Sequence, residues 1–166
     1  MKKEGVTTGF ELQIALYRNY SSGPGLLLEL SPFSSNPTDL LTFLKNARVS
    51  GGQGNEAVEV IYHHVLHEEK DVDQVIILGD AFGNTQAEIN SRRGSERTWA
   101  KYPRFAKRYD CEDLLRQMET RKIPVHSFYI GQPSYPGAYF EAVSRRTGGR
   151  CENYNYQASN AAELLT

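Results

Sequence analysis

The sequence has few of the features that mark a secreted, membrane-bound or nucleic-acid-binding protein. Its two cysteines, Cys111 and Cys151, are too few for a disulfide framework or a cysteine zinc site, so we expect both to be reduced packing residues. No stretch approaches the roughly 20 apolar residues of a membrane helix. The lysines near the start precede no apolar core of a secretory signal. We therefore expect an intracellular, cytoplasmic protein without a membrane partner.

The charge balance excludes a general affinity for polyanions. The formal net charge is −1, which favours neither nucleic acid nor an acidic surface, so no nucleic-acid partner is predicted. At 166 residues the chain fits one domain with a core of its own. Composition alone gives neither a partner nor an oligomeric state.

The first half of the chain predicts a β-hairpin. Residues 10–20 alternate apolar and polar positions, and residues 26–33 form a second apolar run after the turn-forming segment 21–25. The face of the first strand expected in the core carries Phe10, Leu12, Ile14 and Leu16.

The rest of the chain alternates helices with strands. Helices are predicted at 37–47 with Asn36 as the cap, from Asn55 onward, at 111–122, at 138–149 ending in a glycine pair, and at 158–165; strands are predicted at 74–80, 123–131 and 151–156. Only residues 86–110 look irregular. This pattern predicts an α/β fold: a doubly wound, mostly parallel, Rossmann-like sheet with helices on both faces and the antiparallel hairpin at one edge.

Five short motifs occur in an order that resembles von Willebrand factor type A domains. They are "FELQIALYRNY", "SGGQGNEAVEV", "VIILGDAFGNT", "IPVHSFYIG" and "TGGRC". The closest likeness is to the intracellular branch, in which a glycine pair and a Glu-Ala pair open a helix, as Gly51, Gly52, Glu56 and Ala57 do here. The resemblance covers residues 10–166 as a partial domain, with residues 1–9 as an N-terminal tail. None of the motifs is specific alone.

The resemblance implies a sheet of strand order 3-2-1-4-5-6 and a divalent cation held by three loops at its carboxyl edge. Asp80 matches the third-loop aspartate, whereas the second loop has Gln53, Gly54 and Asn55 in place of a threonine. The first-loop Asp-x-Ser-x-Ser motif is absent. The candidate metal ligands are therefore Asp80, Asn55 and Gln53, in a degenerate or incomplete site that would take Mg²⁺ if the first loop is supplied upstream.

By the same resemblance, the first strand and first helix would lie upstream of Met1. The missing strand would be central, and burying five or six apolar side chains at about 1.5 to 3 kcal/mol each amounts to roughly 10 kcal/mol. That is comparable to the whole stability of a domain, about 5 to 15 kcal/mol. The sheet could close up, or another chain could supply a strand; we expect instead that the sequence is a fragment of a longer protein.

Three features can be explained either by a function or by structure alone: Asp80, the histidine pair, and the segment 86–110. Asp80 can simply accept hydrogen bonds from the amides of loop 81–85, which we favour over a cation site. His63 and His67 are one helical turn apart, but His64 occupies the place of the glutamate in a zinc-protease motif, so an accidental pair is expected.

The segment 86–110 mixes basic and aromatic side chains. Such a mixture can bind phosphates and bases, but we favour aromatics that anchor a surface loop, with solvated basic side chains. The basic residues are Arg92, Arg93, Arg97, Lys101, Arg104, Lys107 and Arg108, and the aromatic residues are Trp99, Tyr102, Phe105 and Tyr109.

The function expected is a non-catalytic interaction module that binds a protein partner through its carboxyl-edge loops. The alternative is a metal-assisted, phosphatase-like hydrolase using Asp80, which would need a second carboxylate at another strand end. The strands at 10–20 and 123–131 end without one. No nucleophile with a base and an orienting carboxylate is evident, so no catalytic or cofactor-binding residue is predicted.

Overall fold

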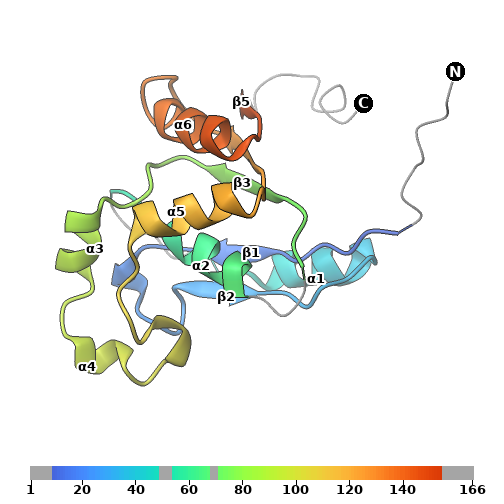
Figure 1. Ribbon diagram of the computed structural model, residues 1–166. Coiled ribbons are helices and arrows are strands. Elements are labelled where there is room, and N and C mark those ends of the chain that lie inside the picture. Colours follow the sequence, from blue (N-terminus) through green and yellow to red (C-terminus); the bar gives the residue numbers. More distant parts are fainter. Residues whose placement is uncertain (1–8, 49–53, 68–70, 155–166) are drawn as a thin grey trace, which may run out of the picture.

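The computed structural model describes residues 9–48, 54–67 and 71–154 and shows a mixed α/β fold (Figure 1). Its elements in chain order are β1 (Ala15–Tyr17), η1 (Tyr20–Ser22), β2 (Leu28–Leu30), α1 (Pro37–Asn46), α2 (Glu59–His67), β3 (Val75–Gly79), α3 (Gln86–Arg92), α4 (Glu96–Trp99), η2 (Pro103–Phe105), α5 (Cys111–Thr120), β4 (Val125–Tyr129), α6 (Gly137–Thr147) and β5 (Cys151–Asn153). The predicted helix 158–165 lies outside the described residues. No described helix is long and apolar enough to cross a membrane.

The predicted hairpin exists, but its covered face is the opposite of the expected one. β1 and β2 pair antiparallel, with Tyr17 opposite Leu28. Ala15 and Tyr17 pack against the core, whereas Phe10 is 71% and Leu12 44% exposed. The reason lies in helix α2, whose His64 ring is 2.7 Å from the Gln13 amide oxygen. The side of the strand that carries Gln13 therefore faces this helix.

The three later strands form the predicted parallel sheet in the order β3-β4-β5. Val75 lies opposite Val125 and Ile77 opposite Ser127. The expectation of one sheet with the hairpin at its edge is corrected, because the described strands form two sheets. β1 reaches β3 through a side chain, with the Tyr17 hydroxyl donating to the Leu78 carbonyl at 3.2 Å.

One face of the parallel sheet packs on helices. Val75, Ile77 and Val125 are buried in a core shared with α2, α5 and α6, and the Ser144 hydroxyl of α6 donates to Ser127 at 2.8 Å. Successive right-handed crossovers that run the same way along a sheet place their helices on the same face.

No described helix covers the other face of the sheet, which we call the open sheet face. Ile76 and Leu78, which point away from the helices, are each 54% exposed. In the described part of the chain the sheet is thus covered on one face, where the sequence predicted two.

Local signals set the helix ends. Asn36 caps α1 as predicted, accepting from the Thr38 amide at 3.0 Å. Gly148 ends α6 in the left-handed conformation, also as predicted. The next residue, Gly149, approaches the sheet so closely that a Cβ there would lie 2.0 Å from the Val125 carbonyl oxygen. Asn55 is not a helix cap, since α2 begins at Glu59.

The segment predicted to be irregular contains three short helices, α3, α4 and η2 (Figure 1). Thr85 and Glu88 form a capping box at the start of α3. Trp99, Phe105 and Tyr109 are buried, which confirms that aromatic residues anchor the segment.

Candidate site at the carboxyl end of β3

Asp80 directly follows β3, at the carboxyl edge of the parallel sheet where α/β folds place their ligand sites. The residue is exposed, and its carboxylate has no hydrogen bond or ion pair within the ranges that the structure describes. The capping role suggested by the sequence is therefore not found there. This carboxylate is available to solvent or to a ligand.

A second carboxylate reaches the same place from the loop before α2. The Glu56 amide donates to the Phe82 carbonyl at 2.8 Å, and the Asn84 amide donates to the Glu56 carbonyl at 2.8 Å. This short parallel bridge, with Glu56 opposite Gly83, joins the loop after β3 to the loop before α2. The pairing brings Glu56 and Asp80 close enough for their charges to interact.

The environment of Glu56 disfavours its negative charge. Burial raises the pKa of its carboxyl, the Asp80 carboxylate raises this pKa further, and the Arg92 guanidinium opposes both effects. One oxygen, Oε2, is buried and without a hydrogen-bond partner among the described residues. A proton or a cation at this position would relieve the unfavourable charge.

Aromatic residues and two glycines form the surroundings. A Cβ at Gly79 would lie 2.9 Å from the Tyr17 hydroxyl, and one at Gly83 would lie 2.2 Å from the Tyr139 hydroxyl. Burial raises the pKa of Tyr17, and Tyr139, Glu56 and Asp80 raise it further. Tyr17 therefore stays neutral and can donate its hydroxyl proton to Leu78.

Of the other predicted ligands, the structure describes Asn55, whose amide and carbonyl are bonded to α3. The Asn55 amide donates to Glu88 Oε2 at 2.8 Å, and the Asn55 carbonyl accepts from Arg92 at 2.5 Å, so Asn55 holds the start of α3. Gln53 lies outside the described residues. The described ranges contain no group of three or more His, Cys, Asp or Glu that could hold a metal ion.

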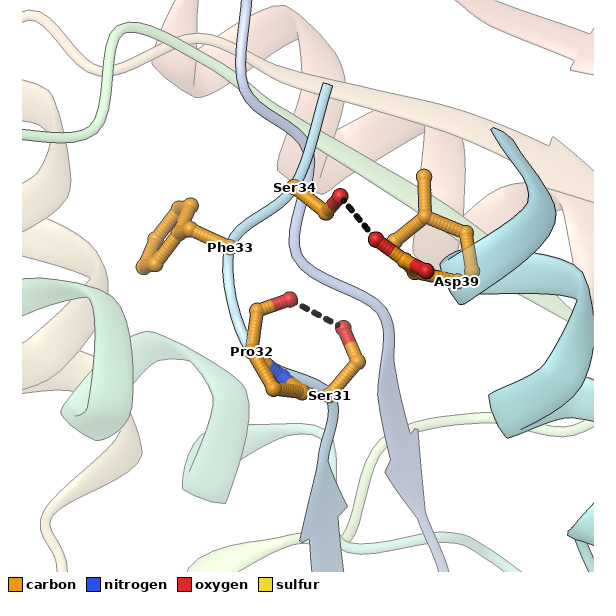
Figure 2. A pocket seen from close by; sticks show the side chains of 6 residues that line it. Ser31, Pro32, Phe33, Ser34 and Asp39 are labelled. Carbon is orange, nitrogen blue, oxygen red and sulfur yellow. Dashed lines mark hydrogen bonds between the residues drawn. The ribbon is translucent and has the colours of Figure 1, made fainter. Parts of the chain in front are cut away.

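A small hollow lies elsewhere, between the end of β2 and the start of α1 (Figure 2). Its volume is about 140 Å³, below the roughly 300 to 1,000 Å³ of ordinary ligand sites. Its polar groups are partnered within the wall, with the Ser34 hydroxyl donating to Asp39 at 3.0 Å and the Ser31 hydroxyl donating to the Pro32 carbonyl at 2.8 Å. We assign no ligand to it.

The histidine pair does not form a chelating site. The rings of His63 and His67 stack at 4.1 Å between centroids, with 16° between their planes. Ring nitrogens coordinate metals in the plane of the ring, so two stacked parallel rings cannot direct both lone pairs at one ion. His63 also packs on Tyr109 at 4.4 Å, and burial lowers its pKa to about 4. This arrangement supports the interpretation of an accidental pair.

The basic segment is partly neutralised from within. Arg92 pairs with Glu88 at 2.9 Å, Arg93 pairs with Glu96 at 3.3 Å, and Arg108 pairs with the same Glu96. The expectation that all of its arginines are solvated is therefore wrong for these three. Arg92 and Arg93 lie four and three residues from their partners, whereas Arg108 reaches Glu96 across 12 positions.

Sequence reasoning missed Glu56 as part of the site, because it interpreted this residue only as favourable to a helix start. Its approach to Asp80 arises from the pairing of Glu56 with Gly83, which are 27 positions apart in the chain. The one usable signal was Gly83, since a glycine within a strand-end loop often marks a close approach of another segment.

A scan against protein-family models finds no match, and a search of curated proteins finds none either. The family therefore remains a proposal.

Proposed function

We propose that this chain is a non-catalytic protein-interaction module of the von Willebrand type A kind, with a degenerate or incomplete cation site at its carboxyl edge. The observation that carries the proposal is the pair of carboxylates, Glu56 and Asp80, on an exposed strand end without further acidic ligands among the described residues. Such a pair can contribute to holding an ion or a partner's cation, but it supplies few of the oxygens that Mg²⁺ prefers.

The strand arrangement supports this kind of fold. The parallel order β3-β4-β5 and the antiparallel β1-β2 hairpin each match a part of the implied order 3-2-1-4-5-6, and the hydrogen bond from Tyr17 of β1 to Leu78 of β3 links the two sheets. One helix from each long connection, α2, α5 and α6, packs into the core that also holds Val75, Ile77 and Val125 of the parallel sheet.

The hydrolase alternative gains one observation, because Glu56 brings a second carboxylate toward Asp80, although from the loop before α2 and not from another strand end. Three side chains that could serve as its nucleophile are unsuited to that role. Ser127 and Ser144 are buried and bond to each other, and burial raises the pKa of the Cys111 thiol to about 12, which keeps it protonated. A binding role requires no nucleophile.

Calorimetric titration with Mn²⁺ and Mg²⁺, beside an assay with a generic phosphate ester, separates the two functions. Asp80→Ala is compared with Asp73→Ala, which removes an exposed carboxylate before β3. We expect no turnover by any variant, and any binding heat to be lost in Asp80→Ala alone. Turnover by the parent protein that disappears in Asp80→Ala would overturn the proposal.

A further inference from the structure

The loop between α3 and α5 concentrates positive charge in a chain that is nearly neutral. Residues 86–110 hold seven basic and three acidic side chains, a net charge of +4 against −1 for the whole chain. We call residues 96–108 of this segment the basic loop. Four of its basic side chains are exposed and form no ion pair in the part of the chain that the structure describes: Arg97, Lys101, Arg104 and Lys107.

The acidic residues nearby are already used. Glu96 accepts from Arg93 and Arg108, Glu88 accepts from Arg92, and Asp110 accepts from the Asp113 amide at the start of α5. In the described part of the chain, none of these three acids forms an ion pair with an exposed cation of the basic loop.

A buried arginine fixes the shape of the basic loop. The guanidinium of Arg93 donates to the Phe105 carbonyl at 2.7 Å and to the Lys107 carbonyl at 2.9 Å. It also lies 5.1 Å from the ring centroid of Trp99, whose indole N–H donates back to the Arg93 carbonyl at 2.5 Å. A loop held by buried charge-assisted hydrogen bonds presents its surface groups with little loss of entropy on binding.

The aromatic side chains decide between two classes of anionic partner. Single-stranded nucleic acid is bound by stacking bases on exposed rings. Trp99, Phe105 and Tyr109 are 2 to 5% exposed, so their rings cannot stack on a ligand, and Tyr102 at 41% is the one exposed aromatic residue of the basic loop. The charge without the stacking surface favours an acidic protein segment.

We propose that the basic loop is a docking surface for an acidic segment of a partner protein. It deepens the proposed function and rests on it, because the connection that leaves the carboxyl end of β3 at Asp80 passes through α3 and then forms this loop (Figure 1). Carboxylates of the partner would pair with Arg97, Lys101, Arg104 and Lys107.

The test is fluorescence anisotropy with a labelled oligo-glutamate peptide, and with oligo-thymidine DNA of matched length. Binding is measured at about 0.01 M and about 0.1 M salt, between which the Debye length falls from about 30 to about 10 Å. One variant changes the four exposed cations of the basic loop to Gln. The control variant makes the same change in net charge at four exposed cations elsewhere: Lys45, Arg48, Arg145 and Arg150.

We expect the basic-loop variant to bind the peptide at least about tenfold more weakly, since four exposed pairs each contribute modestly. The control variant should stay within about twofold of the parent. Equal weakening in both variants, no peptide binding by the parent at low salt, or tighter binding of DNA than of peptide would each overturn the proposal. Asp80→Ala should bind the peptide as tightly as the parent does. A failure of the docking proposal, seen in peptide binding, is therefore distinguishable from a failure of the proposed cation site, seen in the calorimetric titration.

Discussion

Glu59 predicts an unusual dependence of stability on pH. The side chain is 1% exposed, and its Oε1 accepts a hydrogen bond from the Tyr20 hydroxyl at 2.7 Å. Its other oxygen is buried without a partner among the described residues. Burial raises the pKa of the carboxyl from 4.5 to about 7, an effect that Tyr20 and the nearby Asn84 amide only partly offset. The folded protein therefore holds this proton more tightly than the unfolded chain does.

The sign and size of the effect follow from proton linkage. Below about pH 4.5 both states are protonated, and between about pH 4.5 and about pH 7 only the folded state holds the proton. Each pH unit in this interval costs about 1.4 kcal/mol, so Glu59 removes about 3 kcal/mol from the free energy of unfolding by neutral pH. Its contribution is favourable in acid and is lost as the pH rises through about 7.

The substitution Glu59→Gln isolates this contribution. Glutamine keeps the shape and the acceptor for Tyr20 but cannot ionise. His63, whose pKa is lowered by burial, changes stability in the opposite direction below its ordinary value of 6.5, and it is present in both proteins. The difference between the two proteins therefore reports Glu59 without the histidine.

The measurement is urea unfolding of the parent and the variant from about pH 5 to about pH 8. We expect the stability of the parent to fall relative to Glu59→Gln across this range, by about 2 to 3 kcal/mol. Glu141→Gln, an exposed change on α6, should follow the parent throughout. Curves for the parent and Glu59→Gln that stay parallel would refute the reasoning, because the carboxyl would then titrate as it does in water.

Two further changes test the open sheet face and the buried arginine. Ile77 is 3% exposed, so Ile77→Ala should lower the free energy of unfolding in urea by about 2 to 5 kcal/mol. Leu78 is 54% exposed, so Leu78→Ala should lower it by under about 1 kcal/mol. Equal losses of stability would mean that the open sheet face is covered. Arg93→Ala should cost about 2 to 4 kcal/mol by leaving two loop carbonyls unpaired, and should speed proteolysis within the basic loop. Arg97→Ala is its exposed control, and equal cleavage rates would contradict the assigned role of Arg93.

Local sequence signals predicted the elements that depend on local physics. The cap at Asn36 and the glycine stop at Gly148 were correct, because each is decided within a few residues of the helix end. The parallel pairing of β3 with β4 was also correct, since an intervening helix forces it. The apolar alternation in residues 10–20 predicted a strand with two different faces. Which face packs inward is set by α2, whose His64 contacts Gln13, and this long-range contact cannot be inferred from a local pattern.

The candidate site was predictable only in part, for the same reason. Asp80 follows from its place after an apolar run, which fixes it at the strand end. The approach of Glu56, and the use of Asn55 to hold Glu88, depend on loops that meet across long sequence separations. The ion pairs of Arg92 and Arg93 are local, at three or four residues, and could have been read from helical spacing.

Under the proposed fold, one missing element would explain both the open sheet face and the small number of carboxylates beside Asp80 and Glu56. The first strand of the family fold would lie between β1 and β3, where the Tyr17 hydroxyl donates to the Leu78 carbonyl. The helix that follows this strand would cover Ile76 and Leu78. Covering these two half-exposed side chains would contribute about 2 kcal/mol. The loop after that strand would add oxygens to Asp80 and Glu56. A polypeptide that supplied both elements should therefore raise stability and divalent-ion affinity together, whereas one that raised stability alone would separate the fold from the cation site.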